Sequence, residues 1–219
     1  MSDRLIAPAS LTWSYLCTAE ALPESFYLPH PVEVAKRVLG AILIHETPDG
    51  VAAGRLVEVE AYGEDDPASH SYRGRTPRND PMFGRPGRAY VYFTYGMHFC
   101  FNLVTGPENV AGAVLVRAIE PVFGLDVMRR RRFGGANNPS DQTIFNLASG
   151  PAKLCQAMGI GRTQNRSPLQ GKLRLISGGN EPIHIYTGPR IGISTGSDRE
   201  WRFWLDSPFV SRPFKKGDG

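Results

Sequence analysis

The chain has 219 residues, of which 41% are hydrophobic and 21% charged, and its formal net charge is +4. This composition is typical of a globular protein with one sizeable core, and the length does not demand a second domain. The three cysteines stand far apart, with no CxxC pair or Cys/His cluster, which excludes a disulfide framework and a zinc or iron–sulfur site.

The first quarter of the chain predicts an arm, a helix and a hairpin. Residues 1–25 show little periodicity and are expected to form an arm or a short helix that lies on the domain. A helix is predicted over Val32–Leu39, because Pro31 stands in its first turn and Gly40 ends it. The following residues predict a buried strand Ala41–His45, a turn at Asp49-Gly50 and a strand Gly54–Tyr62.

The rest of the chain combines a long loop with short strands and helices. Residues 63–88 form a loop much longer than usual, and such a loop in a compact domain usually binds something. Strands are predicted over Ala89–Tyr95, His98–Val104, Ala113–Ile119, Leu173–Ile176, Ile183–Tyr186, Arg190–Ser194 and Trp201–Trp204. Helices are predicted over Leu125–Phe133, near Ser140–Leu147 and between Pro151 and Gly159. The predicted fold is α+β, a single domain over residues 1–219 with a curved, mostly antiparallel sheet, flanking helices and a protruding aromatic β-hairpin.

Two carboxylates share one face of the predicted strand Gly54–Tyr62. The period of two places Leu56, Glu58, Glu60 and Tyr62 together, on a strand that is otherwise apolar. A buried carboxylate is costly unless it is paired or used. The face is therefore either solvated, or its glutamates pair with arginines, or one glutamate lies in a cleft as a general base.

Aromatic residues concentrate in the predicted hairpin, which carries Tyr90, Tyr92, Phe93, Tyr95, Phe99 and Phe101. Phe93, Phe99 and Phe101 are expected to fill the core. Tyr95 stands beside the turn glycine Gly96, where a side chain is not easily buried. An aromatic ring at a hairpin tip fits insertion into a stack of bases, although a sugar platform remains open.

Arginine dominates the basic residues, with 20 arginines and 5 lysines. The planar guanidinium suits bidentate phosphate contacts, although codon bias in a GC-rich genome explains such a ratio equally well. Arg73, Arg75, Arg78, Arg85 and Arg88 lie in the long loop and are expected to follow phosphates. The run Arg129–Arg132 is either a solvated helix face or a further phosphate contact.

Beyond these patterns, eleven short strings occur in a specific order and spacing. They are VEVEAY (57–62), ASHS (68–71), TPRN (76–79), MF (82–83), PG (86–87), YVY (90–92), YGM (95–97), FCFN (99–102), LVRAIEP (115–121), SGPAKLCQA (149–157) and GPRIGI (188–193). Each string alone is weak, but together they closely resemble the alkyladenine DNA glycosylase (methylpurine glycosylase) family, from about Tyr27 to about Val210.

The resemblance implies roles for the acidic strand and its neighbour. Glu60 matches the general base that deprotonates the water attacking C1′ of a flipped nucleotide, and Glu58 would be structural. Arg117 matches the arginine that helps to hold this carboxylate and the water.

The resemblance also implies a pocket for the base. Tyr62, Tyr92 and His70 match the walls that surround the flipped base, and His70 also matches a hydrogen-bonding group. Tyr95 matches the residue that intercalates into the duplex. Asn102 matches the side chain that crowds the 2-amino group of guanine. Arg73, Arg75 and Arg78 are expected on the DNA backbone.

The implied activity is that of a monofunctional glycosylase that removes alkylated or deaminated purines from double-stranded DNA, without a metal or a cofactor. A bifunctional glycosylase/lyase would need a lysine in the pocket strings, where none stands. Two further functions remain open, a non-catalytic module that recognises lesions and a small metabolic enzyme with an aromatic cleft. We expect a monomer in the cytoplasm, or at the nucleoid if the protein is bacterial, because no signal peptide or membrane span is evident.

Overall fold

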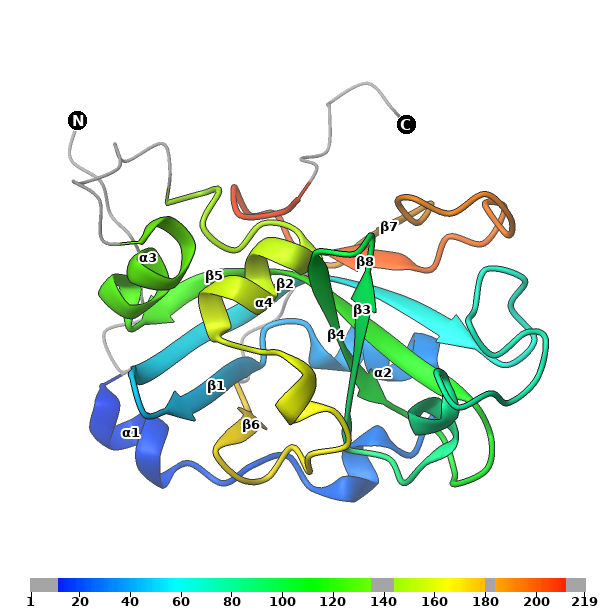
Figure 1. The fold of residues 1–219 in the computed structure, drawn as a ribbon, viewed down its shortest axis with the longest axis horizontal. Helices are drawn as coiled ribbons and strands as arrows, with labels where there is room; N and C mark the ends of the chain where they lie inside the picture. Colours follow the sequence, from blue (N-terminus) through cyan, green and yellow to red (C-terminus); the bar gives the residue numbers. More distant parts are fainter. Residues whose placement is uncertain (1–11, 135–143, 180–183, 212–219) are drawn as a thin grey trace.

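The computed structural model describes residues 12–134, 144–179 and 184–211. Its strands are β1 (Ile42–Thr47), β2 (Gly50–Gly63), β3 (Ala89–Thr94), β4 (His98–Val104), β5 (Gly112–Phe123), β6 (Leu173–Ile176), β7 (Tyr186–Gly188) and β8 (Arg202–Trp204). Its α-helices are α1 (Trp13–Thr18), α2 (Pro31–Val38), α3 (Leu125–Phe133) and α4 (Pro151–Met158). Within the described residues these eight strands form one antiparallel sheet, in the order β3–β4–β5–β2–β1–β6, with β8 pairing both β2 and β7 (Figure 1). The predicted α+β class is confirmed.

Strand β2 is the centre of the sheet. One edge pairs with β5 over most of its length, while the other edge pairs first with β1 and then with β8. The register with β5 shifts between Leu56 and Val59, which marks a bulge. Leu56 therefore packs in the same core cluster as Val57 and Val59, and the expectation that it shares a face with the glutamates is wrong. The expected glutamate positions on the following residues do not depend on Leu56.

Helices α2 and α4 pack on the sheet and contribute to one buried core. Helix α2 begins as predicted, since the ring Nδ1 of His30 accepts a hydrogen bond from the backbone N–H of Val32 at 3.3 Å and Pro31 occupies the first turn. Val34, Ala35 and Val38 of α2 are buried against β2 and β5. Cys100 and Cys155 are buried, as expected, and Cys17 is exposed.

Helix α3 has the predicted bounds, and a glycine stands at each end. Gly124 and Gly134 both adopt left-handed backbone conformations, with φ of 75° and 68°. A Cβ atom on Gly124 would lie 2.0 Å from the carbonyl oxygen of Val51, so only glycine fits between β5 and α3. This close approach holds α3 against the start of β2.

Several predicted elements differ from the structure. The β1–β2 turn is formed by Pro48 and Asp49, because Gly50 already pairs with Thr47. Residues 190–194 form no strand, since the Arg190 side chain turns inward to an ion pair and Gly192 has a φ of 80°. Strand β7 lies C-terminal to the predicted Ile183–Tyr186, of which Ile183 is outside the described residues. Of the helix predicted near Ser140–Leu147, residues 140–143 are outside them too, and residues 144–147 form turns.

The predicted strands Ala89–Tyr95 and His98–Val104 correspond to β3 and β4, which pair antiparallel. Tyr95 and Gly96, with φ of 51° and 67°, form the centre of a turn closed by a 3.2 Å hydrogen bond from Met97 N–H to the Thr94 carbonyl. Positive φ at both central residues is the geometry of a type I′ turn. Phe101 is buried as expected, but Phe93 is 41% exposed, so its expected core position is wrong. Protrusion of this hairpin from the domain stays a prediction.

The N-terminal arm is partly described. Helix α1 lies within the expected arm, and the chain then adds to the edge of the sheet beside β6, where Leu22 N–H donates to the Leu175 carbonyl at 2.8 Å. Trp13 stacks on Phe123 with ring centroids 5.4 Å apart. These contacts hold the arm on the domain.

Candidate functional site

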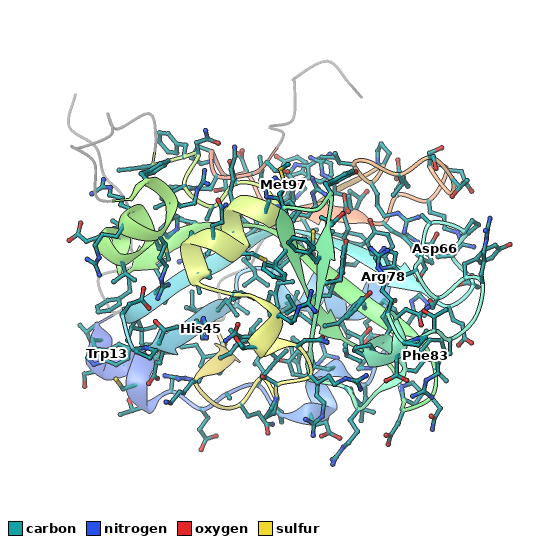
Figure 2. All side chains as sticks on the ribbon, viewed as in Figure 1. Trp13, His45, Asp66, Arg78, Phe83 and Met97 are labelled. Atoms are coloured by element: carbon teal, nitrogen blue, oxygen red, sulfur yellow. The ribbon has the colours of Figure 1, made fainter. Side chains whose placement is uncertain are left out.

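A pocket of about 270 Å³ opens between the C-terminal half of β2, the β3–β4 hairpin, β5 and the loop that follows β7. Most of the predicted site residues line it, namely Tyr62, His70, Tyr92, Tyr95, Asn102 and Arg117. Figure 2 shows Met97 at the tip of the hairpin, with Arg78 and Asp66 on the side of the hairpin where the long loop lies. The structure therefore brings together residues that are far apart in the sequence.

Glu60 lies directly beneath this pocket and is fully buried. Its Oε1 accepts a 2.7 Å hydrogen bond from the backbone N–H of Ile191 and lies 3.1 Å from Nη1 of Arg117. Its Oε2 accepts a 2.8 Å hydrogen bond from the hydroxyl of Tyr62. A carboxylate offers about four acceptor positions, so these three contacts from the described residues leave one on Oε2 for a further donor.

Arg117 joins the two glutamates of β2. Its Nε lies 3.0 Å from Oε1 of Glu58, while Nη1 contacts Glu60. Arg202, on β8, approaches the same oxygen of Glu58 with its Nε at 2.9 Å. The backbone N–H of Ser211 donates to the other oxygen of Glu58 at 2.6 Å, and the Ser211 hydroxyl accepts from Arg117 at 3.3 Å. This set (Glu58, Glu60, Arg117, Arg202 and Ser211) is the charged cluster of the site.

The charged cluster is balanced, with two carboxylates and two guanidinium groups. Burial by itself lowers the pKa of the Arg117 guanidinium, but Glu60 and Glu58 outweigh it and raise the pKa. Burial lowers the pKa of Arg202, and Glu58 opposes this effect. The interpretation in which the glutamates pair with arginines and the one in which a glutamate lies at a cleft are thus both realised, because Glu58 and Glu60 do both.

Aromatic rings form the opposite part of the pocket. The ring of His70 lies edge-on to Tyr92, with centroids 4.6 Å apart, and its Nδ1 is 3.0 Å from the hydroxyl of Tyr90. Burial, with a smaller effect from Arg78, lowers the pKa of His70, so the imidazole is neutral at pH 7. Burial also raises the pKa of Tyr92 and keeps its hydroxyl protonated. The guanidinium of Arg78 lies 5.9 Å from the centre of the Tyr92 ring.

Arg190 holds Tyr62 and the start of the long loop, a role that the sequence patterns did not predict. Its guanidinium lies over the ring of Tyr62, 4.7 Å from the centroid. It also forms a fully buried ion pair with Asp66, with an Nη2–Oδ1 distance of 2.8 Å, and donates to the carbonyl of Ala61 at 2.9 Å. The string GPRIGI contains both Arg190 and Ile191, and it was the only sequence signal that could have indicated this role.

Asn102 and Tyr95 occupy very different environments. Asn102 is 4% exposed and its Nδ2 donates to the carbonyl of Tyr90 at 3.0 Å, across the β3–β4 pair. Tyr95 is 85% exposed at the hairpin tip. Its positive φ is unusual for a bulky residue, because Asn, Asp and Gly tolerate this region far better.

The predicted phosphate-binding arginines differ in how they are engaged. Arg75 forms an ion pair with Asp80, with Nε and Oδ1 2.6 Å apart. Arg73 and Arg78 are exposed, and within the described part of the chain neither forms an ion pair. Arg85 pairs with Glu24 at 3.0 Å.

The run Arg129–Arg132 is used mainly inside the fold. Arg131 pairs with Asp49 at 2.9 Å and donates to the carbonyl of Ala157, which ties α3 to the β1–β2 turn and to α4. Arg132 donates to the carbonyl of Leu147 at 3.1 Å. Of the two open interpretations, a freely solvated face does not describe these two residues.

Metal-binding clusters of three or more His, Cys, Asp or Glu side chains are absent from the residues that the structure describes. The helices in the same ranges include none that is long and apolar enough to span a membrane.

Comparison with known proteins gives a consistent result. The model of the methylpurine-DNA glycosylase family matches residues 25–208. A protein of Nitrosospira multiformis named "Putative 3-methyladenine DNA glycosylase" is 46% identical over 188 residues, which make up 85% of this chain and 92% of that protein. Proteins of the same name from Rhodopseudomonas palustris and Methanoculleus marisnigri are each 49% identical, over 84% and 87% of this chain and 84% and 98% of their own lengths.

Proposed function

Since the chain belongs to the methylpurine-DNA glycosylase family, we propose that it extrudes a damaged purine from duplex DNA and hydrolyses its N-glycosidic bond with a water molecule that Glu60 activates. Membership of the family makes it a DNA glycosylase, a hydrolase of N-glycosyl bonds whose substrate is DNA. The extrusion step, the role of Glu60 and the class of alkylated or deaminated purines are the proposal.

The observation that carries the proposal is the environment of Glu60. A buried carboxylate at the pocket, fixed by Ile191, Tyr62 and Arg117, has one acceptor position left on Oε2. A water molecule bound there would donate one proton to Oε2 as its oxygen forms a bond to C1′ of the nucleotide. The bond between C1′ and the base nitrogen breaks, and its electron pair leaves with the base. A cationic alkylpurine leaves as a neutral base, so this step needs no general acid.

Arg117 contributes by positioning. It binds Glu58 and Glu60 at the same time, so the Glu60 carboxylate has one fixed orientation before the substrate arrives. A preorganised charged group in a site that excludes water lowers the barrier without reorganisation during the reaction. General-base catalysis of this kind supplies a factor of about 10²–10⁴ in rate.

Tyr62, Tyr92 and His70 are proposed to hold the extruded base. Extrusion costs a few kcal/mol, and stacking on an aromatic ring returns about 1–3 kcal/mol per base. Electron-rich rings also attract a positively charged alkylpurine. Asn102 is anchored to Tyr90 and lines the pocket, where its side chain would crowd the 2-amino group of a normal guanine.

Tyr95 and the exposed arginines are proposed to bind the duplex. The Tyr95 ring is free to enter the base stack and to fill the space that the extruded nucleotide leaves. Arg73 and Arg78 are exposed beside the pocket loop and are proposed to contact phosphates, while Arg75 would do so from its ion pair with Asp80.

We propose that the enzyme has no lyase activity, that residues 1–219 act as one catalytic domain and a monomer, and that it works on chromosomal DNA in the cytoplasm. A lyase step needs an amine that attacks C1′. Among the described residues the lysines are Lys36, Lys153 and Lys172, and none of them lines the pocket. Borohydride trapping of a covalent adduct with lesion DNA would contradict this part of the proposal.

The proposal is tested by single-turnover base release from duplex oligonucleotides that carry hypoxanthine, or from methylated DNA. We expect Glu60→Gln to reduce release by about 10²-fold or more and to retain lesion binding. Glu33→Gln, on the exposed face of α2, is the matched control and should release bases like the wild type. Equal release by Glu60→Gln would show that another group is the base. Tight lesion binding with no release by the wild type on any lesion would favour a recognition module instead.

A further inference from the structure

Asn79 is a buried amide that holds the pocket loop at His70. It is 2% exposed, and its Nδ2 donates to the carbonyl of His70 at 2.7 Å and to the carbonyl of Gly74 at 2.9 Å. Its Oδ1 accepts a hydrogen bond from the backbone N–H of Thr76 at 2.6 Å. A reversed amide would turn its oxygen toward two carbonyls and its NH₂ group toward an N–H, so only one orientation satisfies this site. The backbone of His70 is therefore fixed from inside the loop.

Tyr90 holds the other end of the same residue. Its side chain is 1% exposed, and its hydroxyl lies 3.0 Å from Nδ1 of His70. Burial raises the pKa of Tyr90 to about 12, so the hydroxyl keeps its proton at neutral pH. Within the described residues no other acceptor lies within hydrogen-bonding distance of this hydroxyl.

Counting the protons selects one tautomer of His70. If Nδ1 carried the proton and donated to Tyr90, the hydroxyl proton of Tyr90 would remain without a protein acceptor. A buried donor without a partner costs about 1–3 kcal/mol. If Tyr90 donates instead, Nδ1 is the acceptor and the proton of the neutral ring resides on Nε2, at the edge that the pocket leaves open.

We propose that Asn79 and Tyr90 are positioning residues that fix the orientation and the tautomer of His70, so that its Nε2–H presents a hydrogen-bond donor to the extruded base. This inference rests on the proposed function, since it names the substrate edge that the same pocket reads. A donor at this point favours a purine with an acceptor on the edge that reaches His70, such as the exocyclic oxygen of a 6-oxopurine. It disfavours a purine with an amino group there, because two donors would then face each other.

Two lesion classes should depend on this donor to different extents. A neutral 6-oxopurine such as hypoxanthine relies on pocket contacts, whereas a cationic methylpurine already has a weak glycosidic bond and gains from the aromatic rings. Loss of one hydrogen bond of about 1.4 kcal/mol corresponds to about a tenfold loss in rate. The ratio of the two release rates is therefore the quantity to measure.

The first experiment is ¹⁵N NMR of the histidine rings in the wild type and in Tyr90→Phe at pH 7, with the His70 signals assigned by His70→Gln. We expect the wild type to show a proton on Nε2 and an unprotonated Nδ1, and Tyr90→Phe to show a mixture of tautomers. A wild-type proton on Nδ1 would overturn the proposal. This readout involves no catalysis, so its failure is distinct from a failure of the proposed glycosylase mechanism.

The second experiment compares release of hypoxanthine and of a cationic methylpurine under single-turnover conditions. We expect Tyr90→Phe to lower hypoxanthine release about tenfold and methylpurine release less than about threefold. An unchanged ratio would refute the proposed donor.

Asn79→Asp tests the backbone anchor, because it keeps the size of the side chain and replaces two donors by acceptors that face carbonyls. We expect the same change in the release ratio, with an intact circular dichroism spectrum. The matched control is Asn165→Asp, whose Oδ1 accepts from Val91 N–H at 3.0 Å and which keeps that acceptor. An Asn79→Asp variant that folds and keeps the wild-type ratio would contradict its role, and if it does not fold, Tyr90→Phe decides the proposal.

Discussion

The two sides of the pocket are held together by different forces. On the β2–β5 side, Glu58, Glu60 and Arg117 are buried and each makes several ion pairs or hydrogen bonds. On the hairpin side, Tyr92 and His70 make ring contacts, and Tyr95 is almost fully exposed. The difference teaches that the proposed chemical groups are fixed before substrate binds, whereas the proposed recognition groups remain adaptable.

This division agrees with what each task requires. Activation of a water molecule needs a carboxylate whose position is fixed to within a fraction of an ångström. Stacking on a base needs area and approximate orientation, and every base has a face on which a ring can stack. The charged side should therefore respond to the loss of single atoms, while the aromatic side should respond to the loss of whole rings.

The largest effect is expected from Glu58→Gln on the charged side. The substitution removes one negative charge and leaves Arg117 and Arg202 with Glu60 as the remaining carboxylate of the cluster. Breaking a buried ion pair on one side costs about 3–5 kcal/mol. We expect a loss of this size in the free energy of unfolding, measured by urea denaturation. Glu33→Gln, from an exposed pair on α2, should lose less than about 0.5 kcal/mol. A loss below about 1 kcal/mol for Glu58→Gln would mean that the charged cluster is not what fixes this side.

How far the sequence could predict the charged side follows from where its information lies. Glu58 and Glu60 are two residues apart on one strand, so the period of two placed them on one face. Their partners lie much farther along the chain: Arg202 is 144 residues from Glu58, and Ile191 is 131 residues from Glu60. Strand periodicity carries no information on such contacts, so only the resemblance could indicate Arg117 and nothing indicated Arg202.

The aromatic side was predictable for a different reason and to a different extent. Tyr95-Gly96 carries its own turn signal, because the glycine favours the positive φ that a type I′ turn needs. The loop that holds His70 has no periodicity, and its conformation depends on the hydrogen bonds of Asn79 and on the pair of Arg190 and Asp66. These buried polar contacts form only when distant segments meet, and the same contacts explain why residues 190–194 are not a strand.

Tyr95→Asn tests the aromatic side at its exposed end. Asn tolerates positive φ better than Tyr, so the free energy of unfolding should stay constant or rise by up to about 1 kcal/mol. Lesion-DNA affinity should fall by about 1–3 kcal/mol, since the ring that enters the base stack is lost. Urea denaturation and fluorescence anisotropy measure the two quantities, and Tyr15→Asn on α1 is the control for loss of an exposed tyrosine. A parallel loss of stability and affinity would show that Tyr95 acts on the hairpin and not on DNA.

The arginines around the aromatic side should be separable by salt dependence. Arg73→Gln and Arg78→Gln should each reduce the slope of log affinity against log salt concentration by about 0.9, the value for one phosphate contact. Arg75→Gln should change it less, because Asp80 already pairs with this guanidinium. Arg131→Gln should leave the slope unchanged and lower stability, since Arg131 joins α3 to Asp49 and α4. Equal slopes for wild type and Arg73→Gln would remove Arg73 from the phosphate contacts.

The smallest effect concerns pH and again separates the two sides, because His70 is the histidine that lines the pocket in the described ranges. Burial and then Arg78 lower the pKa of His70 in the folded protein, and Tyr90 and Tyr92 are the other titratable groups that face it. The unfolded chain, with a histidine pKa of about 6.5, therefore binds more protons than the folded protein between the lowered value and 6.5. In this window the free energy of unfolding rises with pH, by at most about 1.4 kcal/mol per pH unit for one histidine, and above it the dependence ends.

His70→Gln should remove its share of this slope, while His45, whose pKa burial also lowers, should keep its own share. Urea denaturation at a series of pH values from about 5 to 8 measures both proteins. Identical slopes would show that His70 does not stay neutral in the folded state. That result would also remove the hydrogen bond by which Tyr90 is proposed to select its tautomer, because a protonated Nδ1 cannot accept a proton from a hydroxyl.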